Sequence, residues 1–283
     1  MTKIFVLKNY LHTNIDKKQI KGLFYVRKEV IKILENKDYE LWNGDCLELM
    51  KNIPDKSIDM ILCDLPYGNT ACKWDSIIPF DGLWHHYNRI IKDNGVICLF
   101  GSEPFSSKLR LSNFKMYKYD WIWKKNKASN FINCKYQPLK SYENICVFSK
   151  MACTYSPKGN MKYFPQGIIV LDKAKKQRRT GKKQGEIYHS NPNVETVQTV
   201  SHYPNSIIEF DMEVKNIHPT QKPIDLLEYL IKTYTQDGEV ILDNCMGSGS
   251  TGVAALNLHR KFIGIELDEK YFNIAKERIE KTA

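Results

Sequence analysis

The sequence predicts an α/β protein in which helices connect the strands of a mostly parallel sheet. From Tyr39 onward, short apolar runs alternate with amphipathic stretches, which is typical of strands followed by crossover helices. Near the C-terminus an apolar run ends in Asp243 and leads through a glycine-rich turn into a helix. Only residues 267–283 follow the next expected strand, so the remaining strands of the sheet must lie earlier in the chain.

Composition bounds the class of protein. With 283 residues, of which 42% are hydrophobic, the chain can form one large or two modest globular domains. The formal net charge of +10 fits an acidic partner such as nucleic acid, although a Lys-rich solvated surface gives the same charge. The eight cysteines show no CxxC pair and no zinc-finger spacing, so we expect reduced thiols and no metal site. No apolar run suits a signal peptide or a membrane span, so we expect the protein in the cytoplasm.

The first half of the chain predicts an N-terminal arm followed by strands. Residues 1–39 mix lysines with scattered apolar residues, and Lys28 to Asn36 has the apolar spacing of a helix, so we expect a helical arm. The α/β pattern occupies residues 40–149. Its expected strands are Ser57 to Cys63, Gly95 to Phe100, Tyr119 to Trp123 and Glu143 to Phe148.

The second half predicts an insertion and a return of the α/β pattern. In residues 150–216 the alternation of apolar runs with amphipathic stretches is lost. The segment holds a basic run from Lys173 to Lys183, as expected of a loop-rich module. In residues 217–283, Pro223 is suited to begin a helix that Gly238 ends, and Asp268 to cap a final helix. The expected inward side chains are Ile224, Leu227, Leu230, Ile231 and Tyr234 in the first helix and Phe272, Ala275 and Ile279 in the last. Between these helices lie two expected strands, Glu239 to Asp243 and Lys261 to Glu266.

The glycine-rich turn is ambiguous when taken alone. Gly247, Gly249 and Gly252 satisfy GxGxxG, and Glu266 ends the next strand, where a carboxylate can accept hydrogen bonds from ribose hydroxyls. This arrangement fits NAD and S-adenosylmethionine equally, and the same glycines also suit a tight packing turn. The turn lacks the GxxxxGK[ST] pattern of a P-loop.

A second motif follows the strand Ser57 to Cys63 directly, in the residues Asp64-Leu65-Pro66-Tyr67-Gly68. Ligands of open α/β sheets bind outside the carboxyl ends of the strands, so this motif and the glycine turn should share one rim. An ordinary Pro-containing turn is the alternative for a lone motif of this kind.

Three segments together resemble the DNA amino-methyltransferases. Asp64 to Tyr67 resembles their DPPY motif, and LDNCMGSGST at residues 242–251 resembles their glycine loop. His218 to Pro223 is similar to the HPTQKP segment of the circularly permuted β group, and the three motifs stand in that group's order. The resemblance covers about residues 40–280 and implies a Rossmann-like class I methyltransferase fold. That fold has a mostly parallel seven-stranded sheet, helices on both faces, circular permutation and an inserted target-recognition region.

The resemblance also implies roles for the segments and for single residues. Residues 40–149 would be the catalytic half, 150–216 the target-recognition region and 217–283 the half that binds S-adenosylmethionine, with S-adenosylhomocysteine as the product. The Asp of Asn43-Gly44-Asp45-Cys46 would meet the cofactor's adenine. The implied cofactor-binding residues are Asp45, Cys46, Asp64, Thr220, Lys222, Asp243, Cys245, Gly247, Ser248, Gly249, Thr251 and Glu266. Asn244-Cys245 replaces a common Pro-Phe, so cofactor affinity is the property that this departure affects.

The implied catalytic residues are Asp64, Leu65, Pro66 and Tyr67. An exocyclic amine is a poor nucleophile, and the Asp64 carboxylate and the Leu65 carbonyl would each accept one of its N–H groups. Pro66 would keep the motif rigid, and Tyr67 would stack on a flipped-out base. Leu65 replaces the family's first Pro, but its backbone carbonyl remains. The chain has no Pro-Cys dipeptide, which argues against C5-cytosine methylation. In this family, Asp in the first position favours the N6 of adenine, with N4-cytosine as the alternative.

DNA contacts are expected in two places. Residues 121–140 interleave lysines with aromatic residues, so Lys124 and Lys125 are candidates for phosphate contacts, with a half-buried strand as the alternative. Arg178 and Arg179 belong to the basic run of the insertion, for which a solvated loop is the alternative interpretation.

The expected partner is double-stranded DNA. The resemblance also implies a homodimer, a cognate restriction endonuclease and a bacterial, prophage or phage origin. A nicotinamide-dependent oxidoreductase and a catalytically silent DNA-binding protein remain the rival functions.

Overall fold

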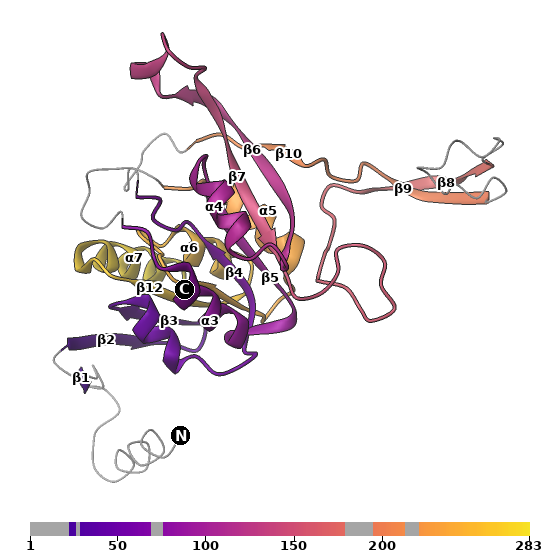
Figure 1. The fold of residues 1–283 in the computed structure, drawn as a ribbon. Helices are drawn as coiled ribbons and strands as arrows, with labels where there is room; N and C mark the ends of the chain where they lie inside the picture. The colour runs from indigo at the N-terminus through magenta and orange to yellow at the C-terminus, as the bar shows by residue number, and fades with distance from the viewer. Residues whose placement is uncertain (1–22, 27–28, 69–75, 179–194, 213–220) are drawn as a thin grey trace.

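The computed structural model describes residues 23–26, 29–68, 76–178, 195–212 and 221–283 (Figure 1). Its centre is a ten-stranded sheet in the order β1-β2-β3-β12-β11-β4-β5-β7-β6-β10. The strands are β1 (Leu23–Val26), β2 (Glu29–Glu35), β3 (Tyr39–Asn43), β4 (Ile58–Cys63), β5 (Ile91–Gly101), β6 (Tyr117–Ser129), β7 (Lys140–Phe148), β10 (Ile207–Glu209), β11 (Val240–Asp243) and β12 (Lys261–Glu266).

The sheet is mostly parallel, as the sequence predicts. β3, β12, β11, β4 and β5 pair in parallel, β7 runs antiparallel between β5 and β6, and β10 pairs in parallel with β6. The seven strands from β3 to β6 therefore match the expected seven-stranded sheet. The β1–β2 hairpin extends it at one edge and β10 at the other. The circular permutation stays a prediction.

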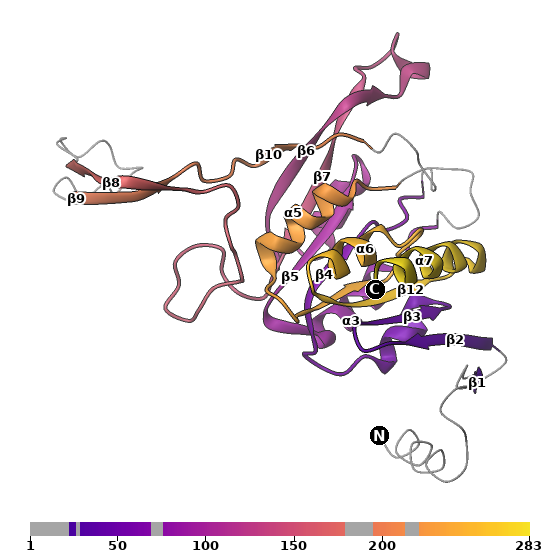
Figure 2. The ribbon, with the colours of Figure 1, turned by 180° about the vertical axis from the view of Figure 1, so that it is seen from behind.

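Helices cover both faces, because the central strands are apolar on both sides. Every residue of β4 is buried, as parallel strands between two helical layers require. One face packs against α5 (Ile224–Tyr234), α6 (Ser250–Asn257) and α7 (Glu269–Thr282). The other packs against α2 (Cys46–Leu49), α3 (Phe80–Ile90) and α4 (Phe105–Ser112). Figures 1 and 2 show the two layers from opposite sides.

The predicted strands and helix caps hold, with two corrections. Asp268 caps α7 by accepting from the N–H groups of Lys270 and Tyr271. The helix expected over Lys28 to Asn36 is wrong, because residues 29–35 form β2, which pairs antiparallel with β3. An otherwise open sheet edge offers backbone hydrogen bonds to a segment rich in β-branched residues. Residues 1–22 of the expected arm lie outside the described residues.

The end of α5 is the second correction. The helix ends at Tyr234, and Thr235 is already extended, with φ −136° and ψ 160°. Gly238 instead lies in the following turn, at φ +77°, where its N–H donates to the His259 carbonyl. A left-handed turn favours glycine. Gly238 therefore shapes the turn between α5 and β11 and does not end the helix.

Two hairpins project from the body. β6 and β7 continue beyond the sheet as a long arm with a short 3-10 helix at Phe131–Asn133 near its tip. In the insertion, β8 (Ile169–Arg178) and β9 (Glu195–Ser201) form a separate antiparallel ribbon, visible in both views. Across the described part of the chain, no helix is long and apolar enough to cross a membrane.

Candidate active site

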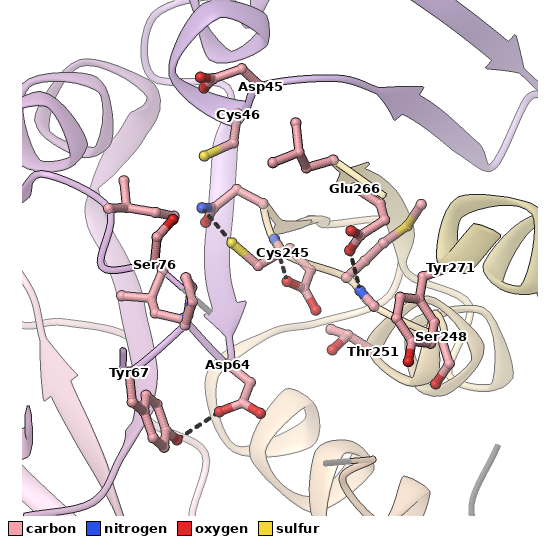
Figure 3. A pocket seen from close by; sticks show the side chains of 18 of the residues that line it. Asp45, Cys46, Asp64, Tyr67, Ser76, Cys245, Ser248, Thr251, Glu266 and Tyr271 are labelled. Carbon is pink, nitrogen blue, oxygen red and sulfur yellow. Dashed lines mark hydrogen bonds between the residues drawn. The ribbon is translucent and has the colours of Figure 1, made fainter. Parts of the chain in front are cut away.

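A cavity of about 320 Å³ lies at the carboxyl ends of β3, β4, β11 and β12 (Figure 3). Asp64 lines this cavity together with Gly247 and Glu266, so residues from distant parts of the sequence meet at one rim. The expected residues that line it are Asp45, Cys46, Asp64, Leu65, Pro66, Tyr67, Lys222, Asp243, Cys245, Gly247, Ser248, Thr251 and Glu266. Gly249 is not among the lining residues, and Thr220 lies outside the described residues.

Glu266 is held by the backbone at the end of β12. One carboxylate oxygen accepts the Gly247 N–H at 2.8 Å, and the other accepts the Asp268 N–H at 2.8 Å. Burial raises the pKa of Glu266. Each oxygen of a carboxylate has a second lone pair, so these bonds orient the group without exhausting its capacity to accept hydroxyl hydrogens.

The sequence left two roles open for the glycines of the loop, cofactor binding and close packing, and the structure shows glycines placed for each. Gly247, at φ +52°, lines the cavity and donates to Glu266. A Cβ on Gly249 would lie 2.9 Å from the Ala275 Cβ, and one on Gly252 would lie 2.5 Å from Ile279 Cδ1. These two glycines therefore allow α7 to pack closely against the loop, as in the packing-turn interpretation.

Asp45 and Asn43 shape the opposite wall. The Asp45 carboxylate accepts the Leu47 N–H at 2.7 Å and caps α2. The Asn43 side chain donates to the carbonyls of Glu266, at 2.8 Å, and Leu267, at 3.2 Å. The ends of β3 and β12 are thereby tied together, which fixes Asp45 relative to Glu266.

The floor of the cavity contains a buried carboxylate and facing thiols. Asp243 accepts the Cys245 N–H at 3.1 Å, and burial raises its pKa to about 6. Cys46 and Cys245 face each other (Figure 3), and the pKa of the Cys46 thiol is raised by its hydrogen bond with Cys245 and by burial. Asn244 turns inward instead, where its Oδ1 accepts from the Tyr87 hydroxyl of α3. The unusual Asn244-Cys245 pair thus anchors the loop and leaves a neutral thiol at the cavity.

Asp64 follows β4 directly and has partners on both oxygens. The Tyr67 hydroxyl donates to Oδ1 at 2.7 Å (Figure 3), and Lys222 Nζ donates to Oδ2. The Tyr67 ring stacks on Phe105, with ring centroids 4.8 Å apart. One face of the ring expected to stack on a base is therefore covered by protein.

Sequence reasoning missed the partners of Lys222. Besides its bond to Asp64, Nζ lies 3.6 Å from Glu143 Oε2 of β7 and 4.9 Å from the centre of the Phe100 ring. Burial alone would lower the pKa of Lys222, but the carboxylates of Asp64 and Glu143 outweigh it and raise the pKa. No spacing rule connects residues 64, 143 and 222, so only the tertiary structure reveals this cluster.

The residues expected to contact DNA are placed unevenly. Lys124 is exposed and pairs with Glu209 at 2.8 Å. Lys125 is only 12% exposed, forms an ion pair with Glu143 and lies over the Trp123 ring, so the structure does not present it to phosphates. Arg178 is the last residue of β8, and Arg179 lies outside the described residues.

Comparison with known proteins identifies relatives over most of the chain. A family model described as DNA methylase matches residues 58–277. Type II methyltransferase M2.LlaDCHI of Lactococcus lactis subsp. cremoris is 28% identical over 276 residues, covering 88% of this chain and 92% of the relative. DNA adenine methyltransferase YhdJ of Escherichia coli (strain K12) is 28% identical over 258 residues, covering 84% and 81%.

Solved structures agree with these relatives. The M1.HpyAVI-SAM complex matches with a TM-score of 0.54 and 25% identity, covering 85% of this chain and 99% of the other. The cytosine-N4-specific PvuII DNA methyltransferase matches with a TM-score of 0.60 and 15% identity, covering 87% of this chain and 90% of the other. At this identity the match shows only that the two proteins share a fold.

Proposed function

The chain belongs to the DNA methylase family, and from this membership we propose that it methylates the N6 amino group of adenine in DNA, using S-adenosylmethionine. The observation that carries the proposal is the presence of Asp64 in the cavity that Gly247 and Glu266 also line. A catalytic carboxylate and a cofactor-binding loop must meet at one rim for direct methyl transfer.

The cavity fits S-adenosylmethionine in its size and in its polar groups. Its volume is about 320 Å³, within the range of small-molecule sites, and carboxylate and hydroxyl side chains line it together with apolar ones. Glu266 would hold the ribose hydroxyls, Asp45 the adenine, and Ser248 and Thr251 the methionine end. Thr220 and Lys222 are further candidates from the resemblance.

S-Adenosylmethionine supplies a methyl group on a positively charged sulfur, so transfer depends mainly on the placement of the accepting nitrogen. Asp64 and the Leu65 carbonyl would each accept one N–H of the target amine and turn its lone pair toward the cavity. Asp64 would be the first acceptor for the proton that leaves the amine. Pro66 would limit motion of the motif, and the Tyr67 ring would border the flipped base.

Adenine is the proposed target for two reasons. The motif begins with Asp64, and a relative that aligns with most of the chain is named a DNA adenine methyltransferase. We assign catalysis to residues 40–149, target recognition to 150–216 and cofactor binding to 217–283. We also propose a bacterial, prophage or phage protein of the cytoplasm, with a homodimer and a cognate endonuclease as its further partners.

Double-stranded DNA is the proposed macromolecular substrate. The net charge of +10 and the projecting β6–β7 arm and β8–β9 ribbon support this assignment. Replacing Arg178 and Arg179 with Ala should flatten the salt dependence of DNA binding, with a slope smaller by about two, because two phosphate contacts are lost. An unchanged slope would exclude both arginines from the DNA contact.

The function is tested by transfer of tritium from labelled S-adenosylmethionine to unmodified genomic DNA, followed by nucleoside mass analysis. We expect N6-methyladenine from the native chain and at least about a 100-fold lower rate from Asp64→Ala. S-Adenosylhomocysteine should still raise the melting temperature of that variant, which controls for folding. If the labelled nucleoside is N4-methylcytosine, the proposed target base is wrong. If the DNA carries no tritium, the proposed activity is contradicted. Modification-detecting sequencing of DNA from cells that express the chain would then give the recognition site.

A further inference from the structure

Lys222 is a buried cation between two carboxylates beside the cavity. Its side chain is 9% exposed, its Nζ donates to Asp64 Oδ2, and Glu143 Oε2 lies 3.6 Å away. Burying an ammonium costs several kcal/mol of desolvation, and an apolar side chain of similar size can often fill such a place. A cation at this point therefore calls for a reason beyond packing.

The carboxylate that Lys222 contacts is the one proposed to receive the target amine. Its Oδ1 accepts from the Tyr67 hydroxyl at 2.7 Å, and its Oδ2 accepts from Lys222. Two donors on opposite oxygens oppose rotation of the carboxylate about its Cβ–Cγ bond. Each oxygen retains a second lone pair that can accept from the amine.

Glu143 fixes Lys222 from the other side. Lys125 donates to Glu143 Oε1, while Oε2 is buried on the side of Lys222. Burial alone would raise the pKa of Glu143, but Lys222 and Lys125 outweigh it and lower the pKa. Glu143 therefore stays ionised, and the charges alternate from Lys125 at the base of the β6–β7 arm to Asp64 at the cavity.

We propose that Lys222 is a positioning residue that keeps the Asp64 carboxylate aimed at the target amine, with Glu143 holding the lysine in place. This inference rests on the proposed function, since it matters only if Asp64 accepts that amine. It differs from the role implied by resemblance, in which Lys222 binds the cofactor.

The chain contains a matched control at the other end of the same strand. Lys162 Nζ contacts Asp59 Oδ1 at 2.7 Å and also pairs with Glu239, and its side chain is 14% exposed. Asp59 lies near the start of β4, whereas Asp64 follows its end. Lys162→Met therefore removes a similar buried cation at the amino ends of the central strands, whereas the cavity lies at their carboxyl ends.

The experiment compares methyl transfer by the native chain, Lys222→Met and Lys162→Met at saturating DNA and S-adenosylmethionine. We expect Lys222→Met to lower kcat by about 100-fold, with both KM values within about threefold, because orientation in the transition state is lost. Lys162→Met should keep kcat within about threefold of the native value. It should lower the melting temperature about as much as Lys222→Met does.

Two outcomes would overturn the inference. One is native kcat in Lys222→Met, whether or not the KM for the cofactor is raised, and the other is an equal loss of kcat in Lys162→Met. If Lys222→Met does not fold, Glu143→Gln decides, with an expected loss of about tenfold in kcat. A native kcat in Glu143→Gln would then refute the inference. Failure of the proposed function is distinct, because the native chain itself would not methylate DNA.

Discussion

Two carboxylates of the cavity, Asp64 and Glu266, are each fixed by two hydrogen-bond donors. Asp64 is held by side chains, Tyr67 and Lys222, whereas Glu266 is held by the backbone N–H groups of Gly247 and Asp268. Donors that are already in place reduce the reorganisation needed when a substrate arrives. The orientation of Asp64 should therefore be more sensitive to substitution than that of Glu266, because one substitution removes a side-chain donor and leaves a backbone donor in place.

Tyr67→Phe tests the side-chain donor directly. The variant keeps the ring and its stacking on Phe105 but removes the hydroxyl that donates to Asp64 Oδ1. We expect kcat for methyl transfer to fall about tenfold and the free energy of unfolding by about 1 kcal/mol. Tyr119→Phe is the control, because it removes a hydroxyl bonded to Tyr234 away from the cavity. Equal activities of both variants and the native chain would contradict this role.

Asp243 predicts a pH-dependent stability. Burial raises its pKa from 3.8 to about 6, so between those values the folded chain binds a proton that the unfolded chain has released. This contribution is present at low pH and is lost as the pH rises from about 4 to about 6, amounting to about 3 kcal/mol.

Asp243→Asn removes that titration while keeping an oxygen that can accept the Cys245 N–H. Urea unfolding at several pH values between 4 and 7 should show the variant gaining stability relative to the native chain as the pH rises toward 6, and little further gain above it. A difference between the two proteins that does not change with pH would contradict the raised pKa.

At the scale of elements, the β6–β7 arm projects on the side of the sheet from which we expect a DNA duplex to approach. β6 runs parallel to β4 and β5, so its carboxyl end leaves the sheet on the same side as the cavity. Phe131 is 64% exposed and Ile132 is 94% exposed near the tip. Exposed apolar side chains on a basic protein are suited to contact bases rather than phosphates.

Replacing Phe131 and Ile132 together with Ser should weaken DNA binding about tenfold without changing its salt dependence, because no phosphate contact is lost. The melting temperature should stay within about 2 °C, since both side chains are exposed. The control is a double Ser variant of Leu111 and Phe114, which are 74% and 71% exposed but lie outside the arm. Equal losses of affinity in the two double variants would remove the arm from the DNA contact.

The elements that build the cavity were predictable because their signals are local. β4 ends at Cys63, directly before Asp64, and β12 ends at Glu266, as the apolar runs indicate. Asp268 caps the helix it precedes. The segment 28–36 was mispredicted because its apolar spacing suits a helix and a strand alike, and the pairing with β3 decides between them. The bond between Lys222 and Asp64 was beyond the sequence, since it joins residues 158 positions apart.

At the scale of the whole molecule, the sheet brings the two ends of the sequence into contact. β3 pairs with β12, and β4 pairs with β11, so the N-terminal and C-terminal portions share one sheet and one cavity. A ligand in this cavity would contact residues at the carboxyl ends of four strands at once. Its binding energy therefore stabilises the fold as a unit rather than one hairpin.

S-Adenosylhomocysteine should accordingly stabilise the whole chain against thermal unfolding. At a concentration 100 times its Kd, a ligand that binds only the folded state adds about 2.7 kcal/mol, which corresponds to a rise of about 5–10 °C for a chain of this size. NAD at the same concentration should give no shift, although the glycine turn alone admits either ligand. Glu266→Ala should reduce the shift, because the carboxylate proposed to hold the ribose is lost while the backbone donors remain. A rise with NAD and none with S-adenosylhomocysteine would favour an oxidoreductase and contradict the assignment of the cavity.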